Sequence, residues 1–305
     1  MTTSPPRPTP LLDAPRPVLD REGLRRKDGA YLEAVRSDPT TRLVVLWRGR
    51  PLLGKGRTPA PLPLTLGAHA HLLEAATETV FLGSAEGERW LAVELDGDTD
   101  PAGFDLPSGG SFEDLRVAGA FMPWPLLEPL LYARGMLRWH RAAAHCEACG
   151  SGDLRSVDGG FARECAACGT RTFPRTDPAV MILVTRGEHA LLARQPRWPR
   201  GMVSALAGFV EPGESLEQCV VRETLEEVGL HVENPVYVGS QPWPFPRSLM
   251  LAFRAEAPEG DVRLDDDELE QARWFTREQL RAPKGFFIPP PISLAHRLVR
   301  SFAEE

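Results

Sequence analysis

Two pairs of cysteines constrain the fold of this 305-residue chain more than any other feature of its sequence. Two residues separate the cysteines within each pair and fifteen separate the pairs, a spacing that points four thiolates at one tetrahedral centre. A glycine follows each pair, where a tight turn needs a residue that tolerates positive φ. The pattern predicts one structural zinc ion per chain that holds the two halves of the chain together, because four protein ligands leave no open position for catalysis. The expected ligands are Cys146, Cys149, Cys165 and Cys168.

Two disulfides, or four buried thiols, are the alternative reading of these cysteines. Five cysteines in all are too few and too unevenly placed for a secreted disulfide scaffold of this length. The first 18 residues hold six prolines and no apolar h-region, so they do not read as a secretory signal. The longest apolar run, 178–184, is too short to cross a bilayer. We therefore expect a cytoplasmic protein without a membrane span.

The order of expected elements divides the chain into four segments. Residues 1–18 are expected to form a flexible proline-rich tail, 19–142 a smaller α+β domain, 143–172 a zinc ribbon and 173–305 an α/β domain. No internal repeat is visible in the sequence. The expected strands are 43–47, 79–82, 90–95, 179–184, 236–238 and 249–253, and the expected helices are 126–141, 215–228, 276–280 and 293–302.

Three glutamates, Glu223, Glu226 and Glu227, stand at i, i+3 and i+4 of the helix expected at 215–228. This spacing places three carboxylates on one helix face within a single turn, where they repel one another. A hard cation is the compensation that the pattern favours, since Mg²⁺ takes oxygen ligands and shares its shell with substrate phosphates. A solvated acidic helix face with Arg222 as its partner is the alternative.

The segment 208–230 resembles the Nudix box, G-x5-E-x7-R-E-U-x-E-E-x-G-U, in which U is a bulky aliphatic residue. Thr224 replaces an aliphatic residue of that pattern, and its β-branched shape predicts altered packing rather than lost activity. The resemblance implies a Nudix α/β/α sandwich that hydrolyses a nucleoside diphosphate linked to another group. The positions in register are Gly208, Glu214, Arg222, Glu223, Glu226, Glu227, Gly229 and Leu230.

The resemblance also implies a role for each charged position of the box. The implied ligands of Mg²⁺ or Mn²⁺ are Glu223, Glu226 and Glu227. The residues implied to orient the loop and the helix are Arg222 and Glu214.

A proline-rich segment follows the box at residues 240–248. Its prolines cannot donate ladder hydrogen bonds, so we expect a stiff loop rather than a regular central strand. Two aromatic rings on such a loop can stack flat heteroaromatic bases at low entropic cost, while a glutamine and a serine offer hydrogen bonds. An ordinary buried loop is the alternative. The residues expected to bind substrate are Gln241, Pro242, Trp243, Pro244, Phe245, Pro246, Arg247 and Ser248.

This segment is similar to S-Q-P-W-P-F-P-Q-S, the signature of the NADH pyrophosphatase branch of Nudix enzymes. That branch also carries a four-cysteine zinc motif between an N-terminal domain and the Nudix domain. Arg247 replaces the last glutamine, and the added cation would favour the phosphates of a longer or 2′-phosphorylated substrate. The branch further implies metal-site contacts at Glu268 and Ala207, and substrate contacts at Ala295 and at Phe173, which replaces a tyrosine.

The resemblance implies metal-dependent hydrolysis of the pyrophosphate bond of NAD(H) to NMN(H) and AMP, and removal of NAD caps from RNA 5′ ends. Two or three divalent cations would neutralise the two phosphates, and Glu227 would accept a proton from the attacking water. Homodimers are typical of the branch. The alternatives are a broader Nudix hydrolase of ADP-ribose or dinucleoside polyphosphates, and a non-catalytic zinc-ribbon module that binds nucleotides or RNA.

The net charge of -7 is unevenly distributed along the sequence. Residues 211–227 contain six acids and one arginine, and residues 259–270 contain seven acids and one arginine. The rest of the chain is therefore slightly basic, which suits a polyanionic substrate that arrives with its metal ions.

Overall fold

The computed structural model describes residues 16–56, 58–264 and 268–305, and these residues fall into two units. The first unit comprises 16–175 together with 244–247, and the second comprises 176–243 and 248–305. Most of the tail expected at 1–18 lies outside the described residues. None of the helices in the described ranges has the length and apolar character that a membrane crossing requires.

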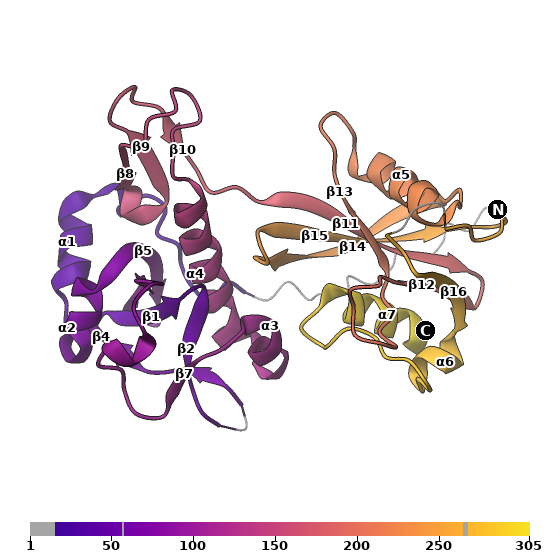
Figure 1. Cartoon of the computed structure of the whole chain (residues 1–305), viewed down its shortest axis with the longest axis horizontal. Helices are drawn as coiled ribbons and strands as arrows, with labels where there is room; N and C mark the ends of the chain where they lie inside the picture. Colours follow the sequence, from indigo (N-terminus) through magenta and orange to yellow (C-terminus); the bar gives the residue numbers. More distant parts are fainter. Residues whose placement is uncertain (1–15, 57, 265–267) are drawn as a thin grey trace. The chain divides into compact units, whose positions relative to one another are not determined.

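A seven-stranded mixed sheet forms the centre of the first unit (Figure 1). Its strands are β1 (Arg42–Trp47), β2 (Arg50–Gly54), β3 (Ala60–Pro61), β4 (Leu64–Thr65), β5 (Ala76–Ala85), β6 (Glu88–Leu95) and β7 (Gly110–Phe112). The strand order is β3-β2-β1-β6-β5, with β4 paired to β1 and β7 paired to β2. The helices of this unit are α1 (Gly29–Ser37), α2 (Leu66–Glu74), α3 (Leu115–Ala118) and α4 (Trp124–Ala142). The strands expected at 43–47, 79–82 and 90–95 and the helix expected at 126–141 are confirmed.

The cysteine segment forms a separate three-stranded sheet in the same unit. Its strands are β8 (Leu154–Val157), β9 (Ala162–Cys165) and β10 (Arg171–Thr172), in the order β10-β9-β8. Arg163 donates from Nη1 to the carbonyls of His140 and Ala143 at the end of α4, at 3.0 and 2.6 Å. These bonds attach the segment to the N-terminal unit, so we place its stabilising contribution within that unit rather than between the two halves of the chain.

The second unit is built on a six-stranded sheet in the order β14-β15-β11-β12-β16, with β13 paired to β11. The strands are β11 (Asp177–Arg186), β12 (His189–Arg194), β13 (Leu206–Phe209), β14 (Glu233–Trp243), β15 (Ser248–Glu256) and β16 (Gln271–Thr276). The helices are α5 (Leu216–Val228), α6 (Arg277–Arg281) and α7 (Leu294–Glu304). The long helix expected at 215–228 and the two helices expected near the C-terminus are confirmed.

The central strand β11 supplies two hydrophobic cores because neighbouring residues on a strand point to opposite faces. Val180 and Ile182 pack with Val220 of α5, whereas Met181 and Leu183 pack with residues of α7. Figure 1 shows the sheet between α5 on one side and α7 on the other. The expected α/β/α sandwich is therefore confirmed.

The two larger sheets share one topology, which is a repeat that the sequence does not show. The first long strand lies parallel to the second strand of a later hairpin in each unit, β1 to β6 and β11 to β15. The same first strand pairs antiparallel with the strand after it and with a short strand, β4 or β13. The helix after that short strand differs, since α2 has one carboxylate, Glu74, where α5 has four. Many sequences can preserve strand order and apolar patterning, so the repeat is visible only in the fold.

The segment 240–248 is a β-hairpin end and not the stiff loop that its prolines predicted. Residues 240–243 complete β14, residues 244–247 form a turn, and β15 begins at Ser248. Pro242 is tolerated because β14 is the edge strand of its sheet, where a missing N–H interrupts no ladder on the outer side. The prediction that the prolines exclude a central strand is confirmed, because β14 is an edge strand. The prediction of a loop over the whole segment is wrong.

Gln241 ties this edge strand to the segment before α7. Its Nε2 donates to the carbonyl of Ile292 at 2.6 Å, and its Oε1 accepts from the N–H of Leu294 at 2.7 Å. The side chain is buried, so both ends of the amide satisfy backbone groups that have no access to water.

We expect Gln241→Ala to destabilise the protein by roughly 1–3 kcal/mol, because two buried backbone groups lose their partners. Urea unfolding of the variant and the wild type would measure the difference. Gln271→Ala, at an exposed position of β16, is the control and should change the free energy of unfolding little. Equal stability of Gln241→Ala and Gln271→Ala would contradict the proposed clamp.

Candidate active site

Helix α5 has well-defined ends that fix the register of its carboxylates. Ser215 caps the N-terminus in a reciprocal capping box with Gln218, and Gly229 ends the helix in the left-handed conformation at φ 67°. Thr224, the departure from the box pattern, is fully buried and donates from Oγ1 to the carbonyl of Val220 at 2.8 Å. Its hydroxyl is thus satisfied within the helix, which explains how a polar residue occupies an aliphatic position.

Arg222 is the centre of the charge network on this helix. Its guanidinium makes a bidentate pair with Glu214, at 3.0 Å from Nε and 2.6 Å from Nη2. Nη1 donates to Glu223 and to Glu226, each at 2.9 Å. Nη2 also donates to the carbonyl of Phe209 at 2.9 Å, which links β13 to α5. One cation therefore orders three carboxylates and the loop before the helix.

Glu214 is held in its ionised form. The Arg222 guanidinium, together with the N–H of Glu211 at 2.7 Å, lowers the pKa of Glu214 to about 2 from an ordinary value of 4.5. A carboxylate so strongly stabilised as an anion is suited to orienting its partners, and it is poorly suited to accepting a proton at neutral pH.

Glu223 lies in a space that only a glycine leaves open. A Cβ atom built on Gly208 would overlap the Glu223 carboxylate, although the backbone of Gly208 has no positive φ that would itself require glycine. Burial raises the pKa of Glu223, and the charges of Glu226 and Glu268 raise it further. Gly208 of the box is therefore required here for space, and the negative charges around Glu223 favour a bound cation.

The other carboxylates differ in their exposure. Glu227 is 4% exposed, whereas the side chain of Glu226 is 58% exposed. Glu268, beyond the box in sequence, accepts from Nε2 of Gln195 at 3.0 Å, and Gln195 Oε1 accepts from Nε of Arg197 at 2.8 Å. Sequence reasoning missed Gln195 and Arg197, because no local pattern connects the β12–β13 loop with a glutamate 73 residues later.

The chemistry of these donors suits a divalent cation, although their oxygen atoms do not converge on one point in this structure. Oxygen donors are the ligands that Mg²⁺ and Mn²⁺ prefer. Arg222 contacts one oxygen of Glu223 and one of Glu226, which leaves the second oxygen of each for a metal ion. Ala207 lies beside this region in β13, opposite Met181 of β11, and has only its backbone carbonyl to offer.

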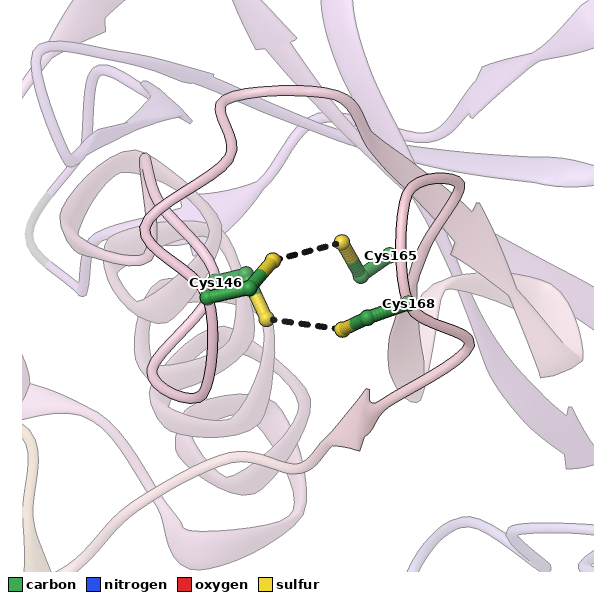
Figure 2. Close-up of side chains that lie close together, drawn as sticks. Cys146, Cys165 and Cys168 are labelled. Carbon is green, nitrogen blue, oxygen red and sulfur yellow. Dashed lines mark hydrogen bonds between the residues drawn. The ribbon is translucent and has the colours of Figure 1, made fainter.

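The four cysteines form a second candidate metal centre, in the first unit. Their sulfur atoms all lie within 4.8 Å of one another, and Cys146–Cys168 and Cys149–Cys165 are separated by 3.7 and 3.6 Å. Four thiolates at about 2.3 Å from a tetrahedral zinc ion stand about 3.8 Å apart, whereas a disulfide requires about 2.05 Å. Figure 2 shows sulfur atoms from the two loops pointing toward one another. The geometry fits a metal ion and excludes the disulfide alternative for this structure.

The turns around the cysteines are formed as their glycines predicted. Gly150 and Gly169 have φ angles of 75° and 73°, and each N–H bonds the carbonyl of the first cysteine of its pair. Among the described residues, this quartet is the only group of His, Cys, Asp or Glu side chains whose ligand atoms converge.

Three residues that were expected to contact substrate are buried within the fold of this structure. Gln241 is engaged by backbone groups, as described above, and Ser248 is buried. Ala295 is 1% exposed, lies on the buried side of α7 and donates from its N–H to the Ser293 hydroxyl. Their side chains stabilise the fold around β14, β15 and α7. Sequence similarity alone does not separate such support from direct contact with a ligand.

The remaining expected substrate residues are accessible to different degrees. Phe173 is 50% exposed and belongs to the first unit. Trp243 is half-buried, and Pro242 is exposed. In the turn 244–247, the carbonyl of Pro244 accepts from Nε of Arg134 at 2.9 Å. The Phe245 ring lies 4.6 Å from the Arg134 guanidinium, while Pro246 and Arg247 are exposed.

Two family models match the chain. A NUDIX domain matches residues 175–294, and an NADH pyrophosphatase-like rudimentary NUDIX domain matches residues 40–139. A crystal structure of a NUDIX hydrolase from Nitrosomonas europaea is 25% identical, with a TM-score of 0.44 over 53% of this chain and 91% of that chain.

Two relatives named NAD-capped RNA hydrolase NudC were compared in sequence. The relative from Chromobacterium violaceum is 44% identical over 227 residues, which are 74% of this chain and 81% of the relative. The relative from Mycobacterium bovis (strain BCG / Pasteur 1173P2) is 38% identical over 308 residues, which are 94% of this chain and 95% of the relative. This chain belongs to the NADH pyrophosphatase branch of the Nudix hydrolases.

Membership of this branch explains the repeated topology. The first unit of this Nudix hydrolase contains the rudimentary NUDIX match, which covers the strands β1 to β7. Its helix α2 lacks the carboxylate face, so the candidate metal-binding glutamates come from the second unit.

The pKa of Glu214 provides a pH test of the Arg222 network in this Nudix hydrolase. Because the folded pKa of about 2 lies below the ordinary value of 4.5, the network contributes stability above pH 4.5 that is lost as the pH falls toward 2. In Arg222→Met, the pKa of Glu214 should rise toward 4.5. A carboxyl ¹³C NMR titration, with Glu214→Gln to assign the signal, would measure it. An unchanged midpoint would contradict the network.

Proposed function

We propose that this Nudix hydrolase cleaves the pyrophosphate bond of NAD(H) to give NMN(H) and AMP, and that it removes NAD caps from RNA 5′ ends by the same cleavage. The observation that carries the proposal is the intact box, in which Arg222 orders Glu214, Glu223 and Glu226. The names of the two relatives, both NAD-capped RNA hydrolases, support the substrate, and one of these relatives matches nearly the full chain.

We propose that Mg²⁺ or Mn²⁺ binds at Glu223, Glu226, Glu227 and Glu268, two or three ions per site, with a backbone contact from Ala207. When bound, such ions neutralise charge on the two phosphates and make water a stronger acid. The charge of Glu268 acts on Glu223, which supports placing both in one site.

The residues of the box have different proposed roles. Arg222 and Glu214 hold the loop and helix in place and keep Glu223 and Glu226 oriented toward the substrate phosphates. Glu227 is the proposed general base, since it is the most buried of the α5 carboxylates and Glu214 is too acidic to accept a proton. It would hold the proton removed from the attacking water at a carboxylate oxygen.

Phe173, Trp243 and the turn 244–247 are the proposed substrate contacts, because aromatic rings stack on the flat bases of a dinucleotide. Arg247 is exposed and would lie near added phosphates if longer substrates bind. Hydrolysis of ADP-ribose or dinucleoside polyphosphates is the alternative activity. The retention of every box carboxylate disfavours a non-catalytic binding module.

Four further expectations remain proposals. We propose a homodimer, as in the branch, and segments bounded at 1–18, 19–142, 143–172 and 173–305. We also propose a cytoplasmic location, because thiolate metal ligands persist in a reducing compartment. The ion held by the cysteines is proposed to be structural Zn²⁺, since the separations of 3.6 and 3.7 Å agree with tetrahedral thiolate coordination.

We expect one zinc ion per chain, and its removal should lower the thermal stability of the protein. Cys165→Ser should lose the metal and unfold at lower temperature, because the two loops are then held by few other bonds. Elemental analysis and thermal unfolding would measure both effects. Cys219→Ser is the control, since Cys219 is buried in α5 and should leave the zinc content unchanged. Full zinc occupancy in Cys165→Ser would contradict the assignment.

The activity is tested with a substrate panel at fixed Mg²⁺ that identifies the products by chromatography. We expect NADH to yield NMNH and AMP, and Glu227→Gln to lower turnover by a factor of roughly 10²–10⁴, the usual contribution of a general base. Gly208→Ala should also lose most turnover, because its methyl group displaces the Glu223 carboxylate.

The control for the glycine is Gly23→Ala, where an added methyl group meets no atom within 4 Å. It should retain full turnover. Undiminished turnover of folded Glu227→Gln would overturn its role as the base. A wild-type protein that produces no AMP from any member of the panel would overturn the proposed function.

A further inference from the structure

The C-terminal part of the second unit is rich in basic residues, whereas the segment before it is acidic. Residues 271–303 contain six lysines and arginines and one acid, whereas residues 259–270 contain seven acids and one arginine. A basic segment thus follows directly in sequence on the acidic segment that carries Glu268. None of these basic residues has a role in the cleavage described above.

A pocket of about 430 Å³ opens between β16 and α6 in this basic region. Arg273, Lys284, Phe275 and Phe286 are among the residues that line it. The two phenylalanine rings lie 4.6 Å apart, and the Arg273 guanidinium lies 4.6 Å from the Phe275 ring and 5.9 Å from the Phe286 ring. Phe275 is buried in the core and Phe286 is partly buried against it, so the pocket combines positive charge with the accessible part of the Phe286 ring.

The two cations of this pocket are available to a ligand. Arg273 and Lys284 are exposed, and no carboxylate among the described residues lies within salt-bridge distance of either. Glu278 also lines the pocket, so its cations exceed its anions by one. By contrast, Arg277 in the same region is paired with Glu188 at 2.7 Å. Unpaired cations beside aromatic rings favour an anionic ligand with flat groups.

The β12–β13 loop connects this pocket to the candidate active site within the second unit. At one end of the loop, Gln195 bonds Glu268 and Arg197, as described above. At the other end, the carbonyl of Gly201 accepts from the N–H of Phe287 at 2.9 Å. Phe287 is 46% exposed and follows the pocket residue Phe286.

Exposed side chains lie on this loop and on the segment that it bonds. Arg197 and Arg200 on the loop are both exposed, as is Phe287. Cations and aromatic rings therefore lie in the pocket and on the two segments that the bond between Gly201 and Phe287 joins. We call this set of residues the basic aromatic track and define it as Arg197, Arg200, Arg273, Lys284, Phe286 and Phe287.

We propose that the basic aromatic track binds the single-stranded RNA chain that follows the NAD cap. The inference rests on the proposed function and identifies the part of the protein that distinguishes a capped RNA from free NAD(H). Single-stranded RNA carries phosphates and bases that can stack, which suits a set of residues that combines cations with aromatic rings. A free dinucleotide ends at its own adenosine and has no further phosphates for Arg273 and Lys284 to bind.

Binding is tested by fluorescence anisotropy of the full chain with a labelled, uncapped 5′-monophosphate RNA of twelve nucleotides. We expect the double variant Arg273→Ala/Lys284→Ala to raise the Kd about tenfold. It should also reduce the slope of log K against log salt by about 1.4, because each phosphate contact to a single strand contributes about 0.7. Arg50→Ala/Lys55→Ala removes the same two charges from exposed positions of the first unit and should leave the Kd unchanged.

Two further measurements separate RNA from other polyanions. Phe287→Leu should weaken RNA binding several-fold, because stacking on an exposed ring is lost while the backbone bond to Gly201 remains. Polyglutamate should compete poorly with the RNA. Equal competition by polyglutamate, an unchanged Kd in the double variant, or equal weakening in the control variant would each overturn the proposal.

Measuring kcat/KM on both NAD-capped RNA and NADH distinguishes a failure of this proposal from a failure of the proposed function. For the Arg273→Ala/Lys284→Ala variant, kcat/KM should fall about tenfold on NAD-capped RNA and stay unchanged on NADH. Equal kcat/KM losses on both substrates would overturn the track. Failure of the wild type to cleave NADH would overturn the proposed function, whereas the anisotropy measurement would still decide whether the track binds RNA.

Discussion

The repulsion among the carboxylates of α5 is the constraint on which the candidate site depends. An isolated helix gains nothing from three glutamates on one turn, and the fold offsets their repulsion with a single guanidinium. Arg222 contacts three carboxylates and a carbonyl of β13, so the same side chain balances charge and fixes the strand against the helix. Gly208 completes the arrangement by leaving room for the Glu223 carboxylate. Charge, space and backbone position are thus coupled along one helix.

The two units share a fold but differ in the side chains that could support catalysis. Both have the same order of paired strands around a long central strand, and the family models recognise a NUDIX domain in one and a rudimentary one in the other. Only α5 carries the carboxylate face, while α2 is short and has a single acid. The sandwich therefore supplies a scaffold, and the catalytic capacity lies in a few side chains on one helix.

Much of the fold and of the site was predictable from local patterns. The helix 215–228, its cap, the cysteine turns and the buried strand 179–184 each follow from a periodicity or a spacing within about 25 residues. The hairpin at 240–248 was not predictable from its prolines, because Pro242 is acceptable only on an edge strand and the strand order is a property of the whole sheet. Gln241 was likewise predicted to bind substrate. Its hydrogen bonds to the backbone of Ile292 and Leu294 could not be predicted, because these residues lie some 50 positions later in the sequence.

The sequence by itself determined the chemistry that the chain can host: a thiolate metal site, a carboxylate helix and a proline-rich segment, each defined by residue types at short spacings. Only the tertiary structure decided which of those residues support the fold and which are accessible. It buried Gln241, Ser248 and Ala295, and it brought Gln195 to Glu268. The physical reason is that burial and hydrogen bonding are determined by strand order and helix packing, which join segments that no local pattern connects.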